Sequence, residues 1–191
     1  MTSAPRTTDS ASLGFSLLEI VVVLVLIAVL AGGAIGLMVA SDDGRALKEC
    51  SVEVEALAKR ARTLAALQQR PYALEFAGNQ VSLMPLAEAM IAPDERERAA
   101  GRSDAEDEGQ GGGFNIVRAD WSAASGIRLF VRRWASEDWI AVDSKNRQVW
   151  RFDPEGFCEP VGVRVQKDAN WLEAEFHPLT ASIRSTASEI Y

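Results

Sequence analysis

The chain has 191 residues, of which 48% are apolar and 25% are charged, and its formal net charge is −7. This length suits one modest domain with additional segments. The acidic balance argues against a general nucleic-acid-binding protein, because contact with phosphates needs clustered lysine and arginine. We therefore expect no nucleic-acid partner.

Few residues have the spacing of a catalytic or metal site. Cys50 and Cys158 lack metal-ligand spacing, and His177 is the single histidine. The sequence contains no nucleophile elbow, phosphate-binding glycine loop or zinc-ligand pattern. The carboxylates at 138–143 and 153–155 lack the oxygen-ligand spacing of a calcium loop, so we interpret them as turn residues. The sequence predicts a non-enzymatic protein with no cofactor and no metal.

An apolar run from Phe15 to Ala40 contains 26 residues and one charge, Glu19. As a helix it would be about 39 Å long, enough to cross a hydrocarbon core of about 30 Å. It is too long for the apolar region of a secretory signal peptide, which has about 7 to 15 residues. A charge at the centre of a bilayer costs about 2.5 to 3.5 kcal/mol, so we expect Glu19 to have a use. The run predicts a transmembrane helix over 15–40.

The sequence GFSLLE at residues 14–19, followed by a long Ile/Val/Leu run, resembles the cleavage and methylation signal of type IV pilin-like proteins. The resemblance implies that a prepilin peptidase cuts between Gly14 and Phe15, removes a leader of residues 1–14 and leaves 177 residues. It also implies methylation of the new amino group of Phe15. Glu19 would direct filament assembly by meeting the amine of a neighbouring subunit, since a buried carboxylate needs a partner.

The segment 41–70 is predicted to be amphipathic and helical. Residues 41–44, Ser-Asp-Asp-Gly, predict a break or a new helix cap. Beyond them, apolar residues recur at spacings of three and four, which indicates a helix over about 45–69 with one face directed at a sheet. Pro71 restricts the residue before it and ends the helix.

Residues 71–191 are predicted to form a β-rich domain. Alternating residues at 72–76 and 81–84 flank a turn at Gly78-Asn79 and predict a hairpin. Short strands with nearby turns favour antiparallel pairing, and one long helix against such a sheet gives an α+β fold. Further strands are expected at 126–131, 139–142, 148–152, 161–165, 171–176 and 181–184.

Two features of this domain allow alternatives. Charged residues followed by five residues containing four glycines interrupt the strand pattern, so we predict a mobile loop at about 88–113. The loop would be a solvated insertion or a lid that binds a partner. Cys50 and Cys158 could form a disulfide in an oxidising compartment, provided that their Cα atoms lie close together.

The order of the elements resembles one branch of the pilin-like family. A helix ending near 70–72, a hairpin, and a strand and turn over 150–156 look like the H-type minor pseudopilins of type II secretion. Minor pilins of the FimT kind share this plan. The resemblance implies a long helix packed on two sheets and a subunit near the tip of a pseudopilus that supports export of folded proteins across the outer membrane.

The same resemblance implies a location and partners. The chain would cross the inner membrane once, with its amino terminus in the cytoplasm and its domain in the periplasm. Its partners would be the prepilin peptidase and methyltransferase, other minor pseudopilins, the major pseudopilin and the inner-membrane assembly platform. The alternatives are a minor pilin of a type IV pilus, acting in assembly, adhesion or DNA uptake, and a membrane-anchored envelope enzyme or sensor.

Overall fold

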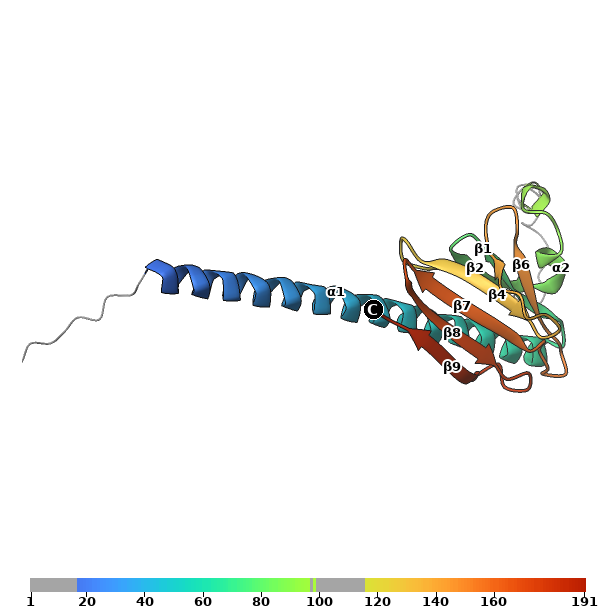
Figure 1. Ribbon diagram of the computed structural model, residues 1–191. Coiled ribbons are helices and arrows are strands. Elements are labelled where there is room, and N and C mark those ends of the chain that lie inside the picture. Colours follow the sequence, from blue (N-terminus) through green and yellow to red (C-terminus); the bar gives the residue numbers. More distant parts are fainter. Residues whose placement is uncertain (1–16, 97, 99–115) are drawn as a thin grey trace, which may run out of the picture. The chain divides into compact units, whose positions relative to one another are not determined.

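The computed structural model describes residues 17–96, 98 and 116–191, without the side chains of 30–41. The chain divides into two units, 1–39 and 40–191. Figure 1 shows the elements. The helices are α1 (Leu17–Gln68) and α2 (Leu86–Ala89), and the strands are β1 (Tyr72–Ala77), β2 (Gln80–Pro85), β3 (Ala119–Ser122), β4 (Arg128–Arg133), β5 (Ile140–Ala141), β6 (Gln148–Phe152), β7 (Val161–Lys167), β8 (Asn170–Phe176) and β9 (Ile183–Glu189).

Helix α1 is continuous through 41–44, so the predicted break at this point is wrong. Tertiary contacts explain the continuity. Asp43, which we expected near a helix cap, instead accepts hydrogen bonds from Lys167 Nζ at 2.7 Å and Asn170 Nδ2 at 3.3 Å. Gly44 leaves room for Ile190, whose Cδ1 would lie 3.0 Å from an added Cβ. These contacts offset the cost of a glycine within a helix, which is about 1 kcal/mol relative to alanine.

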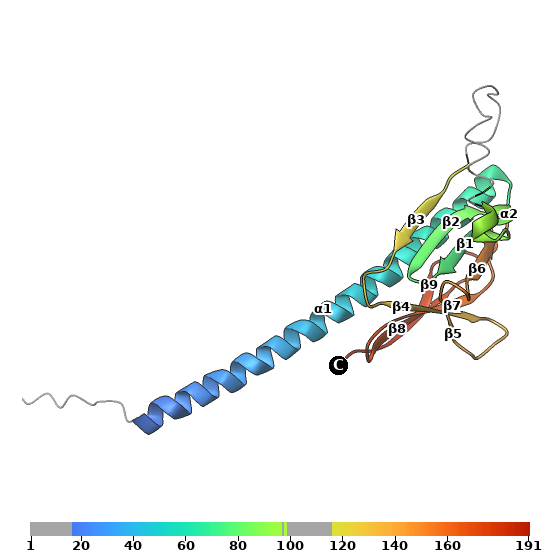
Figure 2. The same cartoon turned by 90° about the horizontal axis from the view of Figure 1, so that it is seen from above.

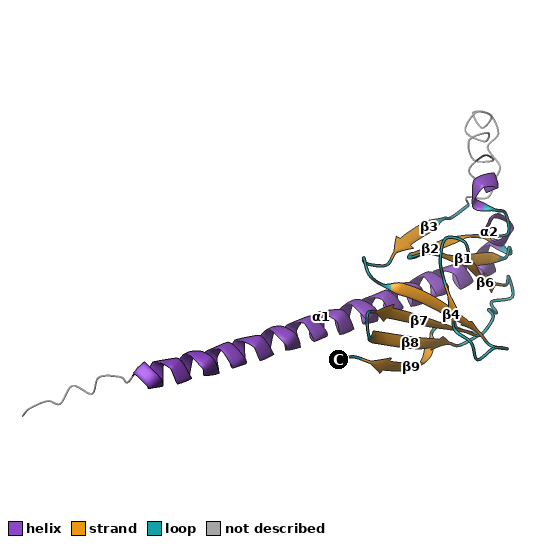
Figure 3. Cartoon of the chain, turned by 45° about the horizontal axis from the view of Figure 1, so that its top comes forward, coloured by secondary structure: helices purple, strands orange, loops and turns teal. Residues whose placement is uncertain are grey.

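The strands form two antiparallel sheets. Sheet A has four strands in the order β3-β2-β1-β6, and sheet B has five in the order β5-β4-β7-β8-β9. Figure 3 shows β1, β2 and β3 as one group and β7, β8 and β9 as another. In Figure 2 the edge strand β3 runs beside α1. The α+β fold predicted from the sequence is therefore confirmed.

The core lies where the carboxyl-terminal part of α1 meets the inner faces of both sheets. Trp150 is completely buried, and its ring centroid lies 4.7 Å from that of Phe152 and 4.9 Å from that of Phe176. Its indole N–H donates to the carbonyl of Glu159 at 2.8 Å, so the buried polar atom is satisfied. The buried apolar residues of α1 share one stripe: Leu47, Cys50, Val54, Leu57, Ala58, Ala61 and Ala65.

Each expected strand is present, with three differences from the sequence prediction. Strand β3 was not predicted, and β9 reaches Glu189 rather than ending near 184. The described part of the expected loop at 88–113 is partly helical, since α2 ends at Ala89 and 93–96 are helical. The prediction of a loop was therefore wrong for this part. Residues 97 and 99–113 lie outside the described residues.

Candidate assembly segment and associated sites

Glu19 lies in the first turn of α1 and its side chain is exposed. It is surrounded in sequence by large apolar side chains that are 47% to 82% exposed, which no described part of the chain covers. These side chains are Leu17, Leu18, Ile20, Val21, Val22, Val23, Leu24, Val25, Leu26, Ile27 and Val29. An apolar surface of this extent is typical of a segment that meets lipid or another protein.

The residues expected to be processed lie outside the described residues. These are the leader of residues 1–14, the cleavage position between Gly14 and Phe15, and the amino group of Phe15. In the part of the chain that the structure describes, no helix combines the length and apolar character needed to cross a membrane. The transmembrane helix over 15–40 stays a prediction.

The disulfide considered for Cys50 and Cys158 is not formed, and both thiols are free and buried. Cys158 lies close to Arg62, which is twelve positions beyond Cys50 on α1, about 18 Å along the axis. The Cys158 Sγ instead points to the carbonyl of Pro178 at 3.3 Å. Burial, with a smaller effect of Glu53, raises the pKa of Cys50 to about 12. Burial also raises the pKa of Cys158 to about 11.

The candidate metal and catalytic residues have structural contacts. Among the described residues, no group of three or more histidine, cysteine or carboxylate side chains could hold a metal ion. His177 Nδ1 accepts a hydrogen bond from the amide of Leu179 at 3.2 Å, and its carbonyl accepts one from Ala181 at 2.9 Å. His177 therefore shapes the turn between β8 and β9.

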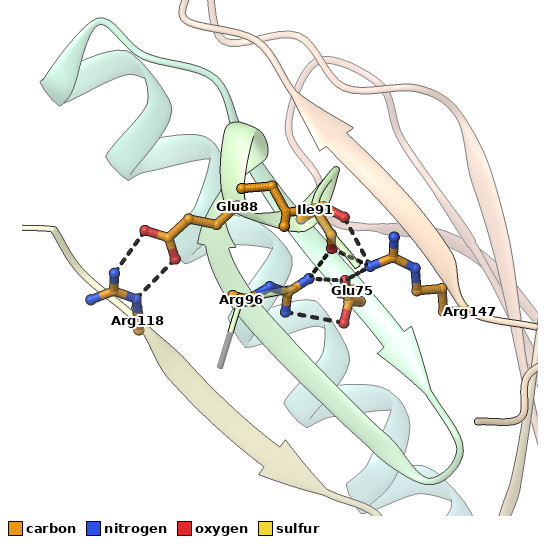
Figure 4. A network of polar contacts seen from close by, with 7 residues as sticks. Glu75, Glu88, Ile91, Arg96, Arg118 and Arg147 are labelled. Atoms are coloured by element: carbon orange, nitrogen blue, oxygen red, sulfur yellow. Dashed lines mark hydrogen bonds and ion pairs between the residues drawn. The ribbon is translucent and has the colours of Figure 1, made fainter. Parts of the chain in front are cut away.

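A buried carboxylate on β1 organises a cluster that the sequence did not predict (Figure 4). The Glu75 side chain is 6% exposed and accepts from Arg96 Nη2 at 2.8 Å and from Arg147 Nη1 at 3.0 Å. Both arginines also donate to the carbonyl of Ile91, at 3.1 Å and 2.9 Å. The Glu75 cluster therefore ties the segment after α2 to β1 and to the start of β6.

A second ion pair holds α2 on the other side. Arg118 Nη2 and Nε donate to the two oxygens of Glu88 at 2.7 Å and 3.0 Å. Arg118 precedes β3, so this bidentate pair ties α2 to the chain just before the edge strand (Figure 4). The only sequence signal for these sites was a carboxylate in an otherwise apolar strand, at Glu75.

Comparisons with known proteins identify the class of the amino-terminal segment. Residues 9–35 match the prokaryotic N-terminal methylation motif. This match confirms the resemblance to type IV pilin-like proteins predicted from residues 14–19. The cleavage position, the methylated residue and the role of Glu19 stay predictions.

One solved structure is similar in fold, the minor pseudopilin EpsH from the type 2 secretion system of Vibrio cholerae. It aligns over 76% of this chain and 95% of its own, with 9% identity and a TM-score of 0.41. No protein among curated sequences matches the chain significantly.

Proposed function

We propose that this protein is a non-enzymatic minor pseudopilin, a structural subunit near the tip of a type II secretion pseudopilus. One observation carries the proposal. The methylation motif over 9–35 includes the start of α1, whose first turn holds a single carboxylate among uncovered apolar side chains. A helix that served only as an anchor would be more stable in lipid with an apolar residue in place of Glu19.

The proposed assembly step follows from charge. Cleavage after Gly14 creates a positive amine at Phe15, four residues before Glu19. A neighbouring subunit's amine gives the Glu19 carboxylate an opposite charge in a low-dielectric environment, where an unpaired carboxylate is strongly unfavourable. Pairing therefore favours one register between adjacent helices. The same requirement disfavours an isolated subunit in the membrane.

The proposed location follows from the same segment. Residues 15–40 hold the chain in the inner membrane, and the domain lies in the periplasm. There it contacts other minor pseudopilins and the major pseudopilin, while the assembly platform acts from the inner membrane. The peptidase that removes residues 1–14 also methylates Phe15.

Intact-mass measurement and amino-terminal sequencing of the protein purified from its native membrane test this proposal. A chain that begins with methylated Phe15 supports it. A chain that still begins with Met1 in cells with an active prepilin peptidase contradicts it and favours a plain membrane anchor.

Secretion and piliation assays then distinguish the two filament systems. Deletion of the gene should block export of folded substrates and leave surface pili intact. Loss of pili with normal secretion would instead support the minor pilin of a type IV pilus.

A further inference from the structure

A groove separates α1 from the edge of sheet A within the unit 40–191. It has a volume of about 370 Å³ and is open to solvent. The buried thiol of Cys50 and the side chain of Ile127 form part of its apolar lining, together with the half-buried indole of Trp121. Apolar floors of this kind accept side chains from a partner.

The strand that borders the groove has an unpaired edge. Within the described residues, strand β3 is the outermost strand of sheet A and pairs only with β2. The amide of Ala123 donates to the carbonyl of Asn79 at 2.8 Å, so residues 79 and 123 form a hydrogen-bonded pair. In an antiparallel ladder, hydrogen-bonded residue pairs alternate with non-hydrogen-bonded pairs, whose main-chain groups point away from the partner strand. The main-chain N–H and C=O groups of Asp120 and Ser122 therefore point away from β2.

These outward groups have no hydrogen-bond partner among the residues that the structure describes. A row of unpaired main-chain donors and acceptors is a template for another strand. Asp120 and Ser122 are both exposed, so a polypeptide can reach them. The edge thus offers the main-chain N–H and C=O groups of two residues for pairing with another strand, beside an apolar groove.

The charge of the groove is negative. Glu49 and Glu53, four residues apart on α1, line it, and no described lysine or arginine does so. Glu49 lies 3.7 Å from Arg45, but both side chains are about 70% exposed, so that pair is weak. Glu53 forms no ion pair within the described residues.

We propose that this groove binds an extended, basic segment of another protein as an additional strand on β3. Its main chain pairs with the outward groups of Asp120 and Ser122. Alternate side chains face α1, where an apolar residue covers Cys50 and a lysine or arginine two positions away meets Glu53. Such strand addition combines main-chain affinity with side-chain specificity. The surface does not depend on the role of Glu19.

Binding of a labelled peptide to the full chain in a neutral detergent tests the inference. The probe is a fluorescein-labelled peptide of sequence KTVTKT, in which Lys, Val and Lys share one face of the strand, and its binding is followed by fluorescence anisotropy. The matched control peptide has the same side chains, with a methyl group on every main-chain nitrogen, so neither of its edges can donate main-chain hydrogen bonds to a strand. We expect saturable binding of the first peptide and binding at least about tenfold weaker for the second.

Substitutions on the protein test the two halves of the site separately. Glu53→Lys should weaken binding about tenfold or more, whereas Glu155→Lys, the same change at an exposed site away from the groove, should not. Ser122→Pro removes an outward N–H without touching the ladder with β2, a position where edge strands tolerate proline. It should abolish binding while circular dichroism stays unchanged.

Four outcomes would overturn the proposal. They are the absence of saturable KTVTKT binding, equal binding of the methylated peptide, unchanged binding by Glu53→Lys, and equal weakening by Glu155→Lys. The last result would show general charge attraction. If Ser122→Pro fails to fold, the methylated peptide still decides the main-chain part, because it leaves the protein unaltered.

Discussion

Gly44 in α1 and Ile190 near the end of the chain are in direct contact, since a Cβ on Gly44 would lie 3.0 Å from Ile190 Cδ1. The neighbouring groups hold this contact in place. The amide of Tyr191 donates to Asn170 Oδ1 at 2.8 Å, and Asn170 Nδ2 donates to Asp43. The carboxyl-terminal residues are thus fixed against the helix at the point where the sequence predicted a break.

Gly44→Leu should lower the free energy of unfolding by about 1 to 3 kcal/mol, because the larger side chain must displace Ile190. Gly44→Ala is the matched control. Its single methyl meets the flexible end of Ile190, and alanine gains about 1 kcal/mol of helix propensity. We expect the free energy of unfolding of the alanine variant to be close to that of the parent protein. Urea denaturation followed by tryptophan fluorescence measures both, and equal stability of the two variants would contradict the contact.

Glu75→Gln should lower the free energy of unfolding by about 3 to 5 kcal/mol. The substitution leaves Arg96 and Arg147 without their shared buried carboxylate, and breaking such a pair from one side is strongly unfavourable. Glu155→Gln, at an exposed turn, should change it by less than about 0.5 kcal/mol. Urea titration of both variants measures the difference. A loss under 1 kcal/mol for Glu75→Gln would show that the Glu75 cluster contributes little.

Stability should fall in acid partly through Glu55. Burial raises its pKa, but hydrogen bonds from Lys59 and the Ile183 amide outweigh this, so the pKa lies below its ordinary value of 4.5. A lowered pKa in the folded state stabilises the fold fully above 4.5, and this contribution is lost as the pH falls through the folded-state pKa. Glu55→Gln should therefore reduce the loss of stability on acidification. Melting temperatures of the parent and of Glu55→Gln between pH 7 and 3 measure this loss. Identical pH profiles of the two proteins would contradict the role of Glu55.

Both cysteines should resist alkylation in the folded protein. The pKa values of about 12 for Cys50 and about 11 for Cys158 keep the thiols protonated at neutral pH, and the thiolate is the reactive form. Iodoacetamide at pH 8 should leave the native mass unchanged and add two groups per chain in denaturant, with or without reductant. Labelling that needs reductant would indicate a disulfide between the two residues.

Glu19→Val should leave cleavage intact and reduce assembly. The apolar helix keeps its length, but in the proposed assembly the Phe15 amine of a neighbour would lose its counter-charge. We expect about tenfold or greater loss of co-purification with other filament subunits, since one buried charge pair is worth several kcal/mol. Glu19→Asp, which keeps the charge, is the control. Normal co-purification of Glu19→Val with the mature amino terminus would contradict the role of Glu19.

Local sequence patterns predicted the helices and strands in which apolar residues recur at a regular spacing. Strand β8 alternates buried and half-buried residues along its whole length and β7 does so over 163–166, and the structure has the two strands as a hairpin. Strand β3 carries a weak signal, because it has four residues, two of them are polar, and only Ala119 and Trp121 among them pack on the core. Its position depends on pairing with β2, which local pattern does not encode.

The remaining errors have the same origin in contacts between distant residues. The turn-like segment 41–44 stays helical because Lys167, Asn170 and Ile190 pack against it. Glu75 is buried because Arg96 and Arg147 reach it from segments 21 and 72 residues away. In the candidate site, the methylation motif could be recognised from sequence because it is a short continuous segment that does not depend on contacts between distant residues.

The position of β1 between β2 and β6 governs when sheet A can form during synthesis. Tyr72 pairs with Pro85 on one side and with Phe152 on the other. The hairpin can form as soon as residue 85 has emerged, but the other edge of β1 stays open until 148–152 arrive. Contacts of such long sequence separation slow folding. A nascent chain shorter than about 152 residues therefore exposes an apolar edge that a chaperone must protect.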